Sequence, residues 1–142
     1  MRSRSRFARS LLALVLLLGA GACRSSEEPD PLVGTFLSTT LIIEPTGLGA
    51  RNALALGGSI GINIANNYVT AGTLVLPPAA TGGAAVVASL AGVADTAGTF
   101  VRFVMPADTF VRDLVFTLVE NRLEARNQVV NGTLYDVVLT RQ

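Results

Sequence analysis

Residues 59–76, SIGINIANNYVTAGTLVL, are the stretch that decides the fold. Ile60, Ile62 and Ile64 alternate with polar or small residues, which is the period of a β-strand with one buried face. Asn66-Asn67 follows, and Asn tolerates the positive φ angles that tight hairpin turns require. The stretch therefore predicts two antiparallel strands joined by a short turn.

The return strand of this hairpin is predicted at Tyr68 to Leu76, where β-branched and apolar residues predominate. With a two-residue turn, Ile64 would lie opposite Val69, and Ile62 would lie opposite Ala71.

The rest of the chain from Leu32 onward has the same character. Alternating apolar faces recur further along, at Val101, Phe103 and Met105 and again at Leu114, Phe116 and Leu118. Turn residues separate these runs, among them Asn131-Gly132 before a last strand predicted from Leu134 to Arg141. Residues 79–97 are rich in Ala and Gly, and we interpret them as a loop followed by a strand at about 84–94, with a short helix as the alternative. Short strands at close spacing predict an all-β antiparallel barrel or sandwich.

Residues 1–22 have the organisation of a signal peptide that is cleaved after export. Four arginines and no acidic residue precede Leu11, and an apolar run continues to Ala22. This run is shorter than the roughly 20 residues that a helix needs to cross a bilayer, but it suits the apolar part of a signal peptide. We therefore expect cleavage after Ala22 and a mature chain that begins at Cys23.

Cys23 is the only cysteine in the chain. Ala20-Gly21-Ala22-Cys23 resembles a bacterial lipobox, with Ala20 where Leu is usual, and this resemblance implies a diacylglycerol on the Cys23 thiol. Several acyl chains hold a protein stably on a membrane without a transmembrane helix. The alternative is cleavage by the ordinary signal peptidase, which would leave a soluble periplasmic or secreted protein. Because Arg24 rather than Asp follows Cys23, we expect the cell envelope, at the periplasmic face of an outer membrane.

The mature chain divides into a tether and one domain. Residues 24–31, RSSEEPDP, are polar and contain proline, so residues 23–31 are predicted to be a flexible tether. Residues 32–142 are enough for a single core.

Composition excludes several classes of function. Four of the eleven basic residues precede Leu11, so seven arginines oppose ten acidic residues in the mature chain, which is a poor match for nucleic acid. His and Lys are absent, and carboxylates at no selective spacing remain as the only candidate catalytic groups. The sequence therefore predicts no enzyme activity, no catalytic residue, no metal site and no cofactor.

Both ends of the domain resemble the small bacterial lipocalin-like lipoproteins. Val33-Gly34-Thr35-Phe36 is similar to the L-x-G-T-W type motif that opens their first strand, and Val137-Val138-Leu139-Thr140-Arg141 to their closing apolar strand that ends in Arg. The resemblance implies an up-and-down antiparallel barrel of about eight strands, closed by its first and last strands. It also implies a plug at one barrel end, with Phe36 at the Trp position and Arg141 packing across it. A β-sandwich remains the alternative fold, because strand alternation is the same in both.

The barrel interior is the remaining route to a function. An eight-stranded barrel either fills with side chains or holds one small ligand. The first hypothesis is a non-catalytic, membrane-anchored envelope lipoprotein that binds a small hydrophobic or amphipathic molecule in a cavity lined by Ile60, Ile62, Phe103 and Phe116. The alternative is a structural or interaction module with a solid core that contacts another envelope protein. A cavity beside these residues would favour the first hypothesis, and a packed interior would favour the second.

Overall fold

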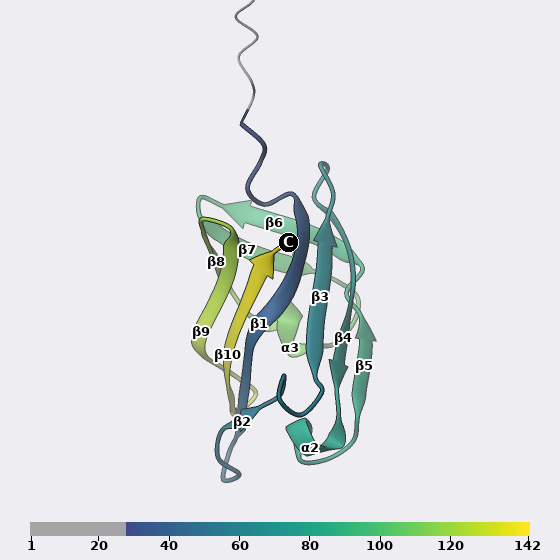
Figure 1. Ribbon diagram of the computed structural model, residues 1–142, viewed down its shortest axis with the longest axis vertical. Helices are drawn as coiled ribbons and strands as arrows, with labels where there is room; N and C mark the ends of the chain where they lie inside the picture. The colour runs from purple at the N-terminus through teal and green to yellow at the C-terminus, as the bar shows by residue number, and fades with distance from the viewer. Residues whose placement is uncertain (1–27) are drawn as a thin grey trace, which may run out of the picture.

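The computed structural model describes residues 28–142, and the predicted signal peptide, its cleavage site and Cys23 lie outside these residues. The described chain forms a β-barrel with two one-turn helices (Figure 1). Its elements are β1 (Gly34–Pro45), β2 (Arg51–Asn52), β3 (Ser59–Ile64), β4 (Val69–Leu76), α2 (Pro78–Thr81), β5 (Val86–Ser89), β6 (Gly92–Ala97), β7 (Phe100–Val104), α3 (Phe110–Asp113), β8 (Phe116–Val119), β9 (Arg122–Val130) and β10 (Thr133–Arg141).

Eight antiparallel strands close the barrel in the order β10-β9-β8-β7-β6-β4-β3-β1, with β10 pairing back onto β1. Two extra strands lie off this ring, because β2 pairs with β1 and β5 pairs with β4. The predicted all-β fold and its closed barrel of eight strands are confirmed, and the sandwich alternative is excluded. Within residues 28–142 no helix has the length and apolar character to cross a membrane.

The hairpin predicted at Asn131-Gly132 is confirmed. Thr133 pairs with Val130, so the loop has two residues, and Asn131 and Gly132 both have positive φ, at 50° and 78°. Positive φ at both loop residues matches the right-handed twist of the flanking strands, and Asn-Gly adopts it at little cost.

The predicted register of the β3–β4 hairpin is wrong by one residue. Ile64 pairs with Thr70 rather than Val69, and Ile62 pairs with Gly72 rather than Ala71. The reason is a third loop residue, Tyr68, which has a φ of 61° and donates its N–H to the carbonyl of Ala65. A turn followed by one left-handed residue makes a three-residue loop, and the positive φ predicted for the asparagines falls on Tyr68 instead.

The single strand predicted at 84–94 is two strands, β5 and β6, and a turn of helix, α2, precedes them at Pro78–Thr81. β5 pairs with the second half of β4, whereas β6 pairs with its first two residues. The chain bends between them at Leu90, whose carbonyl accepts a hydrogen bond of 2.9 Å from the buried Thr70 hydroxyl. Leu90 also donates its backbone N–H to the Gly72 carbonyl at 3.0 Å, so two hydrogen bonds hold the bend against β4. The sequence pattern does not reveal this bend.

The core fills the barrel with apolar side chains from alternate positions of its strands. Phe103 and Phe116 pack edge to face, with ring centroids 5.4 Å apart and an angle of 64° between the rings. Short α3 adds the fully buried Val111, and Phe110 stacks on Tyr135 at a centroid distance of 4.3 Å. Burial of the Tyr135 phenol raises its pKa.

Candidate functional site

The four residues predicted to line a cavity all point into the barrel. Ile60, Ile62, Phe103 and Phe116 each expose 1% or less of their surface. A side chain in contact with a space large enough for water would have accessible surface there, even inside a cavity. These four positions are therefore surrounded by other side chains, and the interior beside them is packed.

The two residues predicted as a barrel-end plug lie opposite each other. Phe36 on β1 pairs in register with Arg141 on β10, and Phe36 is completely buried. Cross-strand partners share one face of a sheet, so Arg141 lies on the same inner face as Phe36, at the end of the barrel. Gly34 makes room for it, because a Cβ at Gly34 would lie 2.8 Å from the Arg141 Nε.

A hydrogen-bonded cluster holds the start of the described chain at this same end of the barrel. Asp30 accepts hydrogen bonds from the Tyr68 hydroxyl at 2.6 Å and from the Leu32 N–H at 2.9 Å. These bonds, followed by the charge of Arg141, lower the pKa of Asp30. The hydrogen bond to Asp30 raises the pKa of the Tyr68 phenol. The chain therefore leaves the barrel at a fixed point, Asp30, which falls within the range predicted as tether.

The charged pairs lie on one side of the barrel, around β9, β10 and α3. Arg126 on β9 pairs with Asp136 on β10 at 3.0 Å, and Arg112 on α3 pairs with Asp108 at 2.6 Å. These pairs are largely exposed, so screening by water leaves them little net contribution to stability. The segment from Asn52 to Ala94, by contrast, contains no charged residue.

This uncharged segment builds one continuous side of the molecule, because β3, β4 and β5 are neighbours in the sheet (Figure 1). We call the outward side of β3, β4 and β5, together with Leu37 of β1, the uncharged face. Val87 on β5 is its most protruding apolar residue, with 71% of its surface exposed. Interface centres are depleted of charge in the same way, whereas ordinary protein surface is not.

A groove of about 470 Å³ opens on the uncharged face. Its lining includes Leu37, Leu54, Ser59, Gly61 and Val75. The Leu37 side chain leans over Gly61, with its Cδ2 only 3.2 Å from the position that a Cβ on Gly61 would take. The groove lies outside the barrel, since outward positions of β1, β3 and β4 form most of its lining. The sequence interpretation missed this face, although the signal was present as a long run without Asp, Glu, Lys or Arg.

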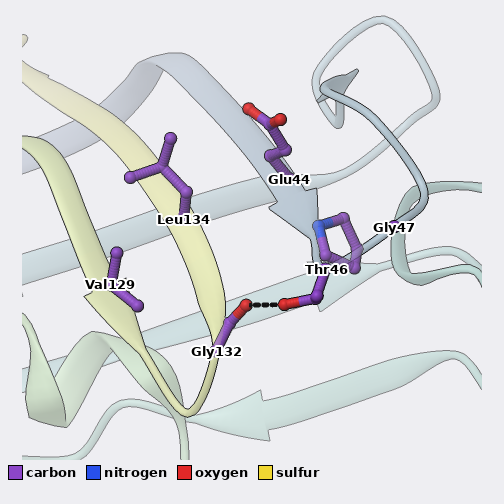
Figure 2. A pocket seen from close by; sticks show the side chains of 7 residues that line it. Glu44, Thr46, Gly47, Val129, Gly132 and Leu134 are labelled. Atoms are coloured by element: carbon purple, nitrogen blue, oxygen red, sulfur yellow. Dashed lines mark hydrogen bonds between the residues drawn. The ribbon is translucent and has the colours of Figure 1, made fainter.

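A second, smaller groove of about 250 Å³ lies at the opposite end of β1, against the β9–β10 hairpin (Figure 2). The Thr46 hydroxyl donates a hydrogen bond to the Gly132 carbonyl across it, and Glu44 is the one charged residue in its lining. A single carboxylate offers neither a metal ligand set nor an acid–base pair. Within the described residues, no three His, Cys, Asp or Glu side chains lie close enough to hold a metal ion.

Comparisons with known protein families, with curated proteins and with solved structures found no match for this chain. The class of protein therefore follows from the fold alone, and it is a closed antiparallel barrel of eight strands, a shape compatible with the lipocalin-like resemblance.

Proposed function

We propose that this chain is a membrane-anchored, non-catalytic module of the cell envelope whose outer surface binds another protein. The observation that carries the proposal is the packed interior combined with the uncharged face. Because Ile60, Ile62, Phe103 and Phe116 each expose 1% or less of their surface, the barrel interior has no room beside them for a small molecule. A packed interior favours the interaction module over the carrier of a hydrophobic ligand.

The anchor rests on the sequence. Cys23 follows a signal peptide and a lipobox-like motif, and lipidation there would hold the barrel at a membrane, at the periplasmic face of an outer membrane where the host has one. Residues 23–31 would then separate the lipid from the barrel. The Asp30 cluster supports this arrangement, because it fixes the end of the barrel from which the tether leaves.

Two measurements test the anchor and the packed interior separately. The Cys23→Ser chain is expected to move from the membrane fraction to the soluble fraction and to lose incorporation of labelled palmitate. Native mass spectrometry of the soluble Cys23→Ser chain, purified without detergent, is expected to give the bare mass of the chain. A reproducible excess mass that disappears on denaturation would identify a bound small molecule and would support the carrier instead.

The uncharged face is tested in the cell with a photo-crosslinking amino acid. Placed at Val87, it is expected to give discrete covalent protein adducts. The matched control is Val129 on β9, which is equally apolar and has 67% of its surface exposed, but lies on the charged side of the barrel. Equal adduct patterns at both positions, or none at either, would overturn the proposed face.

A further inference from the structure

We infer that the uncharged face binds a second copy of this chain, in a two-fold dimer whose axis runs along β4. The inference rests on the proposed function, since it names the partner of the face proposed there. It is carried by the order of three outward residues across the sheet, by the absence of charge and by the end of the barrel at which the described chain begins.

Ser59, Val75 and Val87 form one row across β3, β4 and β5. Val75 pairs in register with Ser59 on one side and with Val87 on the other. Adjacent strands lie about 4.8 Å apart, so Ser59 and Val87 lie at nearly equal distances on either side of Val75. All three point outward, because side chains alternate along a strand and the residues next to them, such as Ile60 and Leu74, are buried.

The two ends of this row have opposite shapes. The Val87 side chain on β5 is 71% exposed to solvent, whereas Ser59 on β3 lines the groove between β1, β3 and β4. A two-fold axis along β4 exchanges the two ends, so Val87 of one copy meets the groove of the other, and the reverse contact forms at the same time. A surface that carries both a projection and a matching hollow at equal distances from an axis is self-complementary, as a two-fold interface requires.

Electrostatics permits this contact. A two-fold axis brings a surface against itself, so a net charge on the face would oppose the same charge on the second copy. The segment from Asn52 to Ala94 has no charged residue, so no such repulsion arises from β3, β4 or β5. Leu37 adds an apolar wall to the groove, because its Cδ2 lies over Gly61, 3.2 Å from where a Cβ on that glycine would stand.

The tether selects this arrangement over pairing of strand edges. β5 pairs only with β4, so its far edge is open and could in principle extend the sheet into a second copy. Antiparallel pairing of two β5 edges would reverse one barrel, and the two chains would leave at opposite ends. An axis along β4 keeps both starting points at the same end, the upper end in Figure 1, so both copies could be anchored in one membrane.

The first test is the mass of the exported Cys23→Ser chain by sedimentation equilibrium. We expect a concentration-dependent shift from monomer to dimer mass at micromolar concentrations, typical of a small interface. Val87→Lys should raise the dissociation constant by at least about tenfold, because it places a charge in the partner's groove. Val129→Lys is the control and should leave it unchanged. A monomer at every concentration overturns the inference without touching the proposed face, which the photo-crosslinking experiment tests independently.

The second test is the arrangement of the two copies, again in the Cys23→Ser background. A chain with Val87→Cys is mixed with a chain with Ser59→Cys and oxidised mildly. We expect a disulfide between the two different chains and little self-linked Val87→Cys dimer, since the two Val87 positions lie on opposite sides of the axis. Efficient self-linking of the Val87→Cys chain, without linkage to the Ser59→Cys chain, would show edge pairing and overturn the axis along β4.

Discussion

Replacement of Phe116 by alanine measures directly whether the barrel is solid. Phe116 is completely buried and packs edge to face on Phe103. Loss of roughly 150 Å² of buried aromatic surface at about 25 cal/mol per Å² costs about 4 kcal/mol, inside the range of about 3–5 kcal/mol for a buried Phe→Ala change. A domain with about 5–15 kcal/mol of stability should still fold.

The assay is equilibrium urea unfolding followed by far-ultraviolet circular dichroism. With a slope of about 1.5 kcal/mol per molar urea, Phe116→Ala should lower the midpoint by roughly 2–3 M. Phe100→Ala on neighbouring β7 is the control, because Phe100 is 54% exposed, and its loss should cost less than about 1 kcal/mol. A cost below about 1.5 kcal/mol for Phe116→Ala would refute the packed interior, since a ring that already adjoins a void loses fewer contacts.

Two further predictions concern the backbone and pH. Gly72→Ala should destabilise the barrel by about 1–3 kcal/mol in the same assay, because the added Cβ would overlap the Gly61 carbonyl, whereas Gly83→Ala, with open space around it, should be nearly neutral. The pKa of Asp30 is lowered in the folded chain, first by the hydrogen bond from Tyr68. The ionised carboxylate therefore stabilises the fold above its unfolded pKa of about 3.9, and this stabilisation is lost as the pH falls through the folded pKa. Asp30→Asn should therefore lose less stability than the unsubstituted chain between pH 5 and 2 in urea titrations; an identical acid dependence would contradict the Asp30 contribution.

Much of the architecture was predictable from local pattern. The alternation at Ile60, Ile62 and Ile64 has the same inward direction in the structure, and Asn131-Gly132 makes the expected turn. The β3–β4 register was not predictable, because it depends on Tyr68 taking a left-handed conformation that Tyr rarely adopts. Its hydroxyl bonds to Asp30, 38 positions away in the sequence, and sequence pattern gives no measure of such a contact.

The candidate site shows the same division. The sequence predicted which side chains enter the barrel, since Phe103 and Phe116 lie at inward positions, but not whether space remains between them. That depends on how side chains from all eight strands meet, which only the closed barrel specifies.

The sequence by itself determined the strand class, the inward and outward faces and the lack of charge from Asn52 to Ala94. Each of these follows from residue type and short-range period. Tertiary structure decided the closure of β1 on β10, the packed interior and the gathering of uncharged residues on one face. These features depend on contacts between strands far apart in the chain. The stability that such contacts give depends on how closely the side chains fit together in space, which residue type and short-range period do not specify.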